Sequence, residues 1–225
     1  MTAKNQNTCA FLALLLSADA VFIVLHLIRA YTPYLSSSYY SLEKDGGYAE
    51  VFQYIKEYWT TGVLAALFVR TRQAVYCTWS LLFGYLLIDD AFQLHERVGR
   101  MLSRKGYFGD SPLTGLRAQD FGELTVSAFA GITFLVLIGG TYLLSTPDAK
   151  QVSKRLVALL GIIIFFGVFV DMLHSAMESL PGSSILGVVE DGGEMLAVSI
   201  TCYYVLGLLR IDRDFFSRLH LGLLT

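Results

Sequence analysis

Long apolar blocks alternate with short polar segments along the chain. A helix needs about 20 mainly apolar residues to cross the hydrocarbon core of a bilayer. Six blocks are close to that length; Glu57 interrupts the second, and a polar RTRQ segment separates it from the third. We therefore predict an all-α, polytopic membrane protein with about six transmembrane helices, near residues 9–28, 51–70, 74–94, 121–144, 156–178 and 188–209.

The composition favours one membrane domain. The 225 residues are 54% hydrophobic and 16% charged, and the mean hydropathy is +0.54. No polar stretch is long enough for a separate soluble domain, so residues 1–225 are predicted to form a single integral membrane domain in the lipid bilayer. The longest polar segments are 29–50 and 97–119, of which the second carries five basic residues and is expected to include a short surface helix.

Several function classes lack their sequence signatures. The net charge is −2 and no basic surface is concentrated, which argues against nucleic acid as a partner. No glycine-rich phosphate-binding motif supports nucleotide binding. No lysine is expected in the middle of a span, which argues against retinal attachment. Cys9, Cys77 and Cys202 have no paired spacing and are expected to be packing thiols.

The short basic connections fall on one side of the predicted bundle. With six spans, both termini lie on that side as well. Short loops rich in Lys and Arg favour the cytoplasm, so both termini are predicted to be cytoplasmic. The basic residues that carry this inference are Arg70, Arg72, Lys150, Lys154, Arg155, Arg210 and Arg213.

The acidic residues gather at the opposite end of the predicted helices. Of 19 Asp and Glu residues, one lies mid-span and three lie on the predicted cytoplasmic side: Asp19, and then Asp148, Asp212 and Asp214. The other 15 lie at the far end, where Glu43, Asp45 and Asp110 are expected to be solvated loop residues. A charge in hydrocarbon costs about 2.5–3.5 kcal/mol on insertion scales, so acids inside the apolar helices need water, a partner or a cation.

Two acidic spacings recur and predict repeated hairpins. The third and fifth spans each end in an Asp and a Glu seven residues apart, which places both on one helix face. The fourth and sixth spans each open with Asp-x-Gly-Glu. The residues are Asp89 and Glu96, Asp171 and Glu178, Asp120 and Glu123, and Asp191 and Glu194. Hairpins 74–144 and 156–209 are therefore predicted to form a pseudo-symmetric four-helix bundle, with 9–70 as a more diverged copy.

Three histidines lie at the same depth as these acids. His26, His95 and His174 fall in the outer third of the first, third and fifth spans. Asp171 and His174 are three residues apart, so they share a helical stripe. One buried membrane histidine usually bonds a neighbouring helix, but three at one depth beside carboxylates favour metal ligation.

Two structural interpretations compete with ligation. Acids in a first helical turn, such as Glu190, Asp191 and Glu194, could cap free N–H groups. Arg97, Arg100 and Arg117 could neutralise the acids as rim ion pairs, and shared protons could neutralise paired carboxylates. Capping does not explain acids near helix C-termini, where the dipole disfavours negative charge; these are Asp89, Asp90, Glu96, Asp171 and Glu178.

We interpret the acidic end as a divalent metal site. The predicted ligands are Asp89, His95, Glu96, Glu123, Asp171, His174, Glu178, Glu190 and Glu194, and the supporting or path residues are Asp19, His26, Glu57, Asp90, Asp120 and Asp191. Mixed imidazole and carboxylate ligands favour Mn, Fe or Zn slightly over Ca or Mg. The predicted function is divalent cation transport or conduction; the alternatives are a membrane metalloenzyme acting on a lipid or quinone-like substrate, and a structural or sensory protein with an ion-paired cluster. The sequence leaves the substrate and the oligomeric state open.

Overall fold

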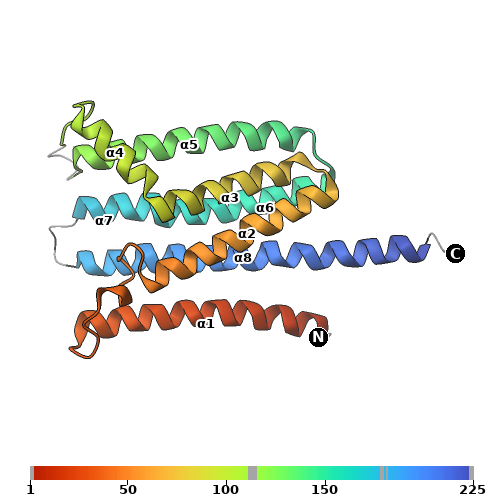
Figure 1. Cartoon of the computed structure of the whole chain (residues 1–225), viewed down its shortest axis with the longest axis horizontal. Coiled ribbons are helices and arrows are strands. Elements are labelled where there is room, and N and C mark those ends of the chain that lie inside the picture. Colours follow the sequence, from red (N-terminus) through yellow and green to blue (C-terminus); the bar gives the residue numbers. More distant parts are fainter. Residues whose placement is uncertain (1–2, 111–115, 178–179, 181, 223–225) are drawn as a thin grey trace.

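The structure is a computed structural model that describes residues 3–110, 116–177, 180 and 182–222. Every regular element in these ranges is helical, and the long helices run side by side (Figure 1). The elements are α1 (Ala3–Tyr31), the 3₁₀ turn η1 (Ser38–Tyr40), α2 (Tyr48–Thr71), α3 (Ala74–Phe92), α4 (Leu94–Arg104), α5 (Ala118–Leu143), α6 (Pro147–Ile164), the π-helix η2 (Phe165–Val170), α7 (Asp171–Met177) and α8 (Ser183–Gly222).

Four helical segments are long and apolar enough to cross a membrane. They are Cys9–Tyr31, Ala118–Leu143, Pro147–Met177 and Ser183–Leu209. Helices α2 and α3 form a hairpin that runs alongside them, but charged residues such as Lys56 and Asp90 dilute their apolar character. The protein is thus a helical membrane protein, and the count of six spans stays a prediction.

The two ends of the bundle differ in chemistry. The start of α1 and the end of α8 lie at the same end as the turn between α2 and α3 (Figure 1). The 32–47 loop, α4 and the start of α8 lie at the other, which we call the acidic end. Which end faces the cytoplasm stays a prediction.

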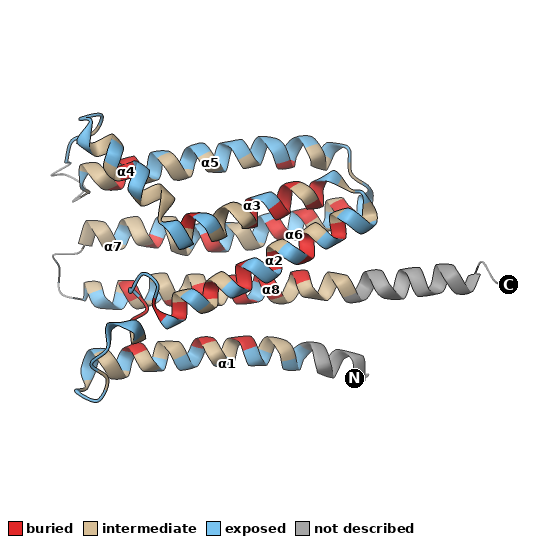
Figure 2. Ribbon diagram, viewed as in Figure 1, coloured by how far each residue is buried: buried red, intermediate tan, exposed pale blue. Residues whose placement is uncertain are grey.

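The main hydrophobic core lies away from the acidic end. Buried residues are concentrated in α2, α3 and the middle of α8 (Figure 2). Trp79 and Phe83 of α3 stack here, and the Trp79 indole N–H donates to Ser153 Oγ at 2.9 Å. Leu64, Leu156 and Val205 are each fully buried in this cluster. The half of the bundle beyond the acidic end is therefore closely packed and apolar.

The third predicted span ends earlier than expected. Gln93 adopts the left-handed conformation (φ 52°), which ends α3 at Phe92 and starts α4 at Leu94 in a new direction. Asp89 and Glu96 consequently belong to different helices, and the prediction that they share one helix face is wrong. The prediction of a short surface helix in 97–119 is confirmed by α4, which begins three residues earlier.

The fifth and sixth spans also differ from expectation. The fifth is divided by the π-helix η2, after which α7 carries Asp171 and His174. Helix α8 begins at Ser183, so Glu190 lies about two turns inside the helix rather than in its first turn. The first-turn capping interpretation of Glu190, Asp191 and Glu194 is therefore wrong. The hairpin repeat stays a prediction.

Candidate functional site

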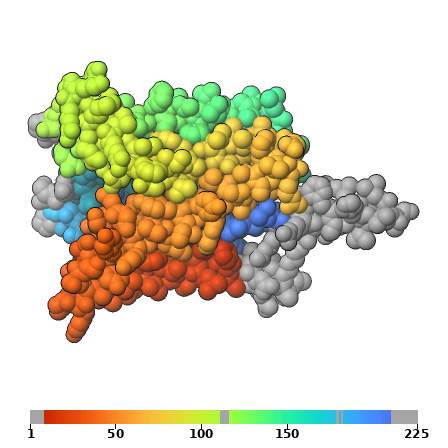
Figure 3. Space-filling view, viewed as in Figure 1, coloured from red at the N-terminus to blue at the C-terminus, as the bar shows by residue number. Residues whose placement is uncertain are grey.

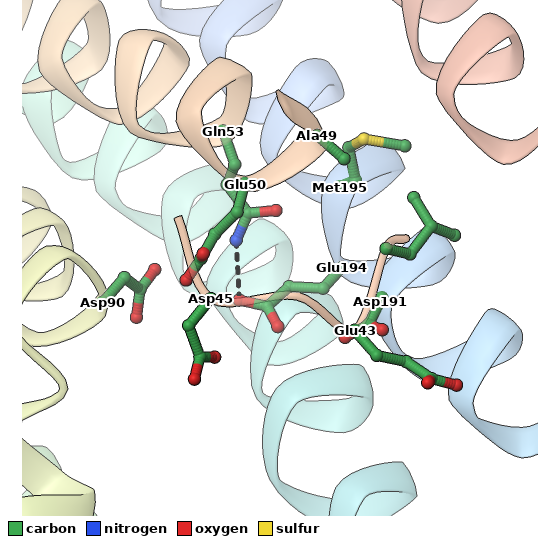
Figure 4. Close-up of a pocket in the computed structure, with 10 residues that line it drawn as sticks. Glu43, Asp45, Ala49, Glu50, Gln53, Asp90, Asp191, Glu194 and Met195 are labelled. Atoms are coloured by element: carbon green, nitrogen blue, oxygen red, sulfur yellow. Dashed lines mark hydrogen bonds between the residues drawn. The ribbon is translucent and has the colours of Figure 1, made fainter. Parts of the chain in front are cut away.

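A cavity of ≈ 120 Å³ opens at the acidic end between the loop before α2, the start of α2, the end of α3 and α8. Six carboxylates and one amide supply its polar lining (Figure 4). Among its described lining residues there is no basic side chain and no histidine. The lining residues are Leu42, Glu43, Asp45, Ala49, Glu50, Gln53, Asp90, Asp191, Glu194 and Met195. We call this cavity the acidic pocket.

Side-chain contacts hold the acidic pocket in shape. Gln53 Nε2 of α2 donates to Glu194 Oε1 of α8 at 3.1 Å (Figure 4). Gly167 of η2 backs the same carboxylate, because a Cβ added there would lie 2.9 Å from Glu194 Oε2. In the loop, the backbone N–H of Gly46 donates to the Glu50 carboxylate. The pocket is therefore built from three separate parts of the chain.

His26 fixes the loop wall of the acidic pocket. Its Nδ1 accepts a hydrogen bond from the Leu42 backbone N–H at 3.1 Å and lies 3.3 Å from Ser41 Oγ. Since Nδ1 accepts from a backbone amide, the imidazole proton resides on Nε2. The side chain is 5% exposed. His26 thus positions the loop; its predicted supporting role in a metal site stays a prediction.

A buried ion pair lies next to the acidic pocket. Lys56 Nζ of α2 donates to Asp19 Oδ1 of α1 at 3.0 Å and to Ser199 Oγ of α8 at 3.0 Å. Its third donor meets the backbone carbonyl of Met195, a pocket residue, at 2.9 Å. The Ser199 hydroxyl donates to Asp19 Oδ2 at 2.5 Å. We call this arrangement the Lys56 lock; it ties α1, α2 and α8 together.

The hydrogen bonds define the charge states in the Lys56 lock. An ammonium group has three donors, and all three meet acceptors here. A carboxylate offers only acceptors, and Asp19 receives one bond from Lys56 and one from Ser199. Lys56 and Asp19 have side chains that are 0% exposed. Lys56 lies within the predicted span 51–70, but its helix α2 is not one of the four segments that are apolar enough to cross a membrane.

Glu57 lies beside the lock with an unsatisfied oxygen. The residue is 2% exposed, and its Oε2 has no hydrogen-bond partner among the described residues. Glu57 also interacts with the carboxyl group of Asp90, which lines the acidic pocket. Two neighbouring carboxyl groups do not both ionise cheaply, so a shared proton is favoured. This pair therefore connects the pocket wall to the Lys56 lock through titratable groups.

A second carboxyl cluster adjoins the pocket. His174 Nδ1 of α7 lies 2.7 Å from Glu190 Oε2 of α8, and the Asp171 carboxyl group also interacts with that of Glu190. Asp171 and His174 therefore lie on the same face of α7, as their spacing predicted. Glu43 and His174 meet above Gly187, where an added Cβ would lie 2.6 Å from Glu43 Oε1 and 3.1 Å from His174 Cε1. Glu43 thus reaches both clusters.

Asp89 and His95 form a separate pair at the break between α3 and α4. The Asp89 carboxylate accepts from the His95 backbone N–H at 2.8 Å and lies 3.0 Å from His95 Nδ1. Burial opposes charge on the imidazole, but the hydrogen bond and charge of Asp89 outweigh it and raise the pKa of His95 to about 9. His95 is therefore an imidazolium at neutral pH, and its Nδ1 donates to Asp89.

Two predicted ligands, Glu96 and Glu123, and the predicted supporting residue Asp120 have structural contacts at the rim. Arg100 donates to Glu96 at 3.0 Å, one turn away on α4. Asp120 accepts from the Arg117 backbone N–H at 2.7 Å and from its guanidinium, which caps α5. Gln119 donates to Glu123 at 2.6 Å. The predicted rim ion pairs are confirmed for Glu96 and Asp120, while Glu178 lies outside the described residues.

The predicted ligands do not converge on one point. Among the described side chains of 9–110, 116–177, 180 and 182–209, no three from His, Cys, Asp or Glu are placed to hold a metal ion together. Instead, Asp90, Asp191 and Glu194 line the acidic pocket, whereas His174 and Glu190 pair beside it.

Sequence reasoning missed several pocket and lock residues. Glu43 and Asp45 are exposed loop residues, as expected, but nothing in the sequence indicated that they also line the acidic pocket. Gln53 and Ser199 are uncharged residues in apolar helices and carried no signal of their own. Lys56 did carry a signal, because a lysine six residues into the predicted span 51–70 needs a buried acid as partner.

The family of the chain follows from its sequence. The model of a family described as "Domain of unknown function (DUF8692)" matches residues 8–208. The chain belongs to this family. The match includes every described residue of the acidic pocket and the Lys56 lock. No curated protein and no solved structure matches the chain.

Proposed function

We propose that the acidic pocket binds a divalent cation that keeps part of its hydration shell, as the loading step of cation transport. The observation that carries the proposal is the lining of the pocket: six carboxylates, with no basic side chain among the described lining residues. Such a cavity favours a cation strongly, since the acids otherwise repel one another in a partly buried site.

The size of the acidic pocket supports a hydrated ion. A water molecule occupies about 30 Å³ in the liquid, so a cavity of ≈ 120 Å³ has room for a cation with a few waters. Carboxylates that do not converge on one point can still bind such an ion through its waters. Mg²⁺ in particular dehydrates reluctantly and is commonly held by one or two carboxylates plus water.

The ligand chemistry favours hard cations. Carboxylate, carbonyl and water oxygens suit Mg²⁺, Ca²⁺ and Mn²⁺, whereas imidazole suits Zn and Fe. The sequence favoured Mn, Fe or Zn because it grouped histidines with the acids. The described histidines, however, are engaged elsewhere: His26 with Leu42, His95 with Asp89 and His174 with Glu190. We therefore propose Mg²⁺, Ca²⁺ or Mn²⁺ as the ion class.

Transport would require the Lys56 lock to open. The lock adjoins the pocket through the Met195 carbonyl, and Trp79 and Leu64 belong to the closely packed apolar core. A cation that moved inward would meet the Lys56 ammonium and would have to displace it from Asp19. The charge of Lys56 would therefore block passage inward from the pocket in the conformation described here.

The absence, among the described residues, of an open path inward past the Lys56 lock also supports a second candidate function, that of a metalloenzyme. A pocket open at one end suits a reaction on a substrate that arrives from the membrane surface. Cation flux into proteoliposomes separates the two. Transport requires accumulation of ⁴⁵Ca²⁺ or Mn²⁺ inside vesicles, whereas an enzyme binds the ion without flux.

Binding can be measured with Mn²⁺ as a paramagnetic probe. Detergent-purified protein is titrated with Mn²⁺, and the free ion is quantified by its electron paramagnetic resonance signal. The test variant is Asp191→Asn in the pocket, and the matched control is Asp148→Asn, an exposed aspartate in the first turn of α6. Both variants make the same chemical change.

We expect saturable Mn²⁺ binding by the wild type and the Asp148→Asn control, displaced by Mg²⁺ or Ca²⁺. Asp191→Asn should weaken binding about tenfold, as expected for one lost carboxylate contact of about 1.4 kcal/mol. Equal Mn²⁺ affinity in all three proteins, or no binding by the wild type at millimolar Mn²⁺, would overturn the proposal.

A further inference from the structure

Helix α4 has two chemically different faces. The face toward α5 is tightly packed, since an added Cβ on Gly122 of α5 would lie 2.5 Å from the Gly99 backbone oxygen of α4. Phe108, just after α4, stacks on Phe121 with ring centroids 6.5 Å apart. These contacts clamp α4 onto the first two turns of α5.

The opposite face of α4 is cationic. Arg97, Met101 and Arg104 follow one another at spacings of four and three residues, so they share the side turned away from Gly99. All three are exposed, as is Lys105 at the end of the helix. Within the described part of the chain, the side chains of Arg97, Arg104 and Lys105 form no ion pair. We call Arg97, Met101, Arg104 and Lys105 the basic face.

The position of α4 at the end of α5 determines where the basic face lies relative to the membrane. Helix α5 is a candidate span with exposed apolar side chains along its length, including Phe129 (74% exposed) and Ile132 (65%). The exposed apolar residues of α5 begin with Leu124, two residues after the contact of Gly122 with Gly99 of α4. Helix α4 lies at the end of α5 and forms part of the outer surface there (Figures 1 and 3). The basic face is thus at the level of the lipid headgroups.

We propose that the basic face binds the phosphate headgroups of anionic phospholipids. Charge complementarity selects this occupant: unpaired guanidinium and ammonium groups at headgroup depth match phosphates, and each such residue contributes about 1 kcal/mol. Met101 (48% exposed) and Val98 (38%) add apolar contact for the upper acyl chains. This binding surface is separate from the acidic pocket and does not depend on cation binding there.

Native mass spectrometry of the full-length protein tests the proposal. The protein is titrated in detergent with phosphatidylglycerol, and with phosphatidylcholine of the same acyl chains as the zwitterionic control. The test variant is Arg97→Gln/Arg104→Gln. The matched control is Lys44→Gln/Lys154→Gln, which removes the same charge from exposed residues outside α4.

We expect the wild type and the Lys44→Gln/Lys154→Gln control to bind phosphatidylglycerol in preference to phosphatidylcholine. Arg97→Gln/Arg104→Gln should weaken phosphatidylglycerol binding roughly 5- to 30-fold and leave phosphatidylcholine binding unchanged. Equal binding of phosphatidylglycerol by both double variants would overturn the proposal. So would equal binding of the two lipids by the wild type, or displacement of phosphatidylglycerol by millimolar inorganic phosphate, which would make the face a phosphate site.

Discussion

Lys56 Nζ and Asp19 Oδ1 lie 3.0 Å apart, with both side chains fully buried between α1, α2 and α8. The pair joins residues 37 positions apart in the sequence and touches the acidic pocket through the Met195 carbonyl. A charge buried in hydrocarbon is costly, so each partner depends on the other for neutralisation. The first prediction tests this dependence.

Removing one partner of the pair should be more harmful than removing both. Lys56→Met leaves Asp19 buried and unpaired, and should lower the free energy of unfolding by about 3–5 kcal/mol. Lys56→Met/Asp19→Leu should recover most of that loss, because an apolar pair needs no neutralisation. Tryptophan fluorescence during denaturant unfolding in detergent measures both. A double variant no more stable than Lys56→Met would contradict the ion-pair account, and Lys154→Met is the exposed control.

Gly192 and Gly193, two neighbouring glycines of α8, should respond differently to substitution by alanine. A Cβ at Gly193 would lie 2.3 Å from Phe166 Cδ1, and a ring in a packed helix pair cannot move aside without separating η2 from α8. A Cβ at Gly192 would lie 3.5 Å from Ile23 Cδ1, an ordinary contact. We expect Gly193→Ala to lower stability by about 1–3 kcal/mol and Gly192→Ala to leave it unchanged or slightly higher. Thermal unfolding of both variants provides the comparison, and similar melting temperatures would argue against the close packing of Phe166.

Gly167 should affect cation affinity more than stability. A Cβ there would lie 2.9 Å from Glu194 Oε2, at the far end of a flexible side chain that can move. Gly167→Ala should therefore displace the carboxylate and reduce Mn²⁺ affinity severalfold while the protein stays folded. Gly161→Ala is the control, because an added Cβ there has no neighbour within 4 Å. Unchanged Mn²⁺ affinity in Gly167→Ala would remove Glu194 from the proposed site.

The His95 pair should make stability depend on pH. The pKa of His95 is raised to about 9, above the ordinary value of 6.5, mainly by Asp89, with Asp90 and Glu123 adding to the effect. Because the pKa is raised in the folded state, protonated His95 contributes its full stabilisation below pH 6.5. This stabilisation is lost as the pH rises through 9. The stability difference between wild type and His95→Gln should therefore be largest near pH 6 and shrink by pH 9.5.

Asp89→Asn is the control for the cause of that shift. Without the Asp89 carboxylate, the pKa of His95 should return toward its ordinary value. A titration of the His95 imidazole by nuclear magnetic resonance measures this directly. A pKa near 6.5 in the wild type would contradict the pairing described here.

The all-α fold and the gathering of acidic residues at one end of the bundle could be predicted from the sequence. Both depend on the residue pattern within individual helices and not on contacts between them. Four of the six apolar blocks coincide with helices that are long and apolar enough to cross a membrane, and the acidic pocket lies at the end of the bundle where the acids gather. The stripe of Asp171 and His174 was also correct, because α7 is regular there. Local periodicity was sufficient for these features.

The remaining errors arose where backbone geometry or tertiary contacts decide the outcome. The left-handed Gln93 separated Asp89 from Glu96, although glutamine carries no sequence signal for that conformation. The start of α8 at Ser183 moved Glu190 out of the first turn. The pocket position of Glu43 depends on a loop that is held by His26, which only the folded chain reveals.

The most direct test of the central proposal is anomalous diffraction from crystals of the protein soaked in Mn²⁺. We predict a single strong anomalous peak inside the acidic pocket, near Asp191 and Glu194, with water completing the coordination of the ion. A peak at His174 and Glu190 with direct side-chain ligation, or no peak at saturating Mn²⁺, would contradict the hydrated-cation site.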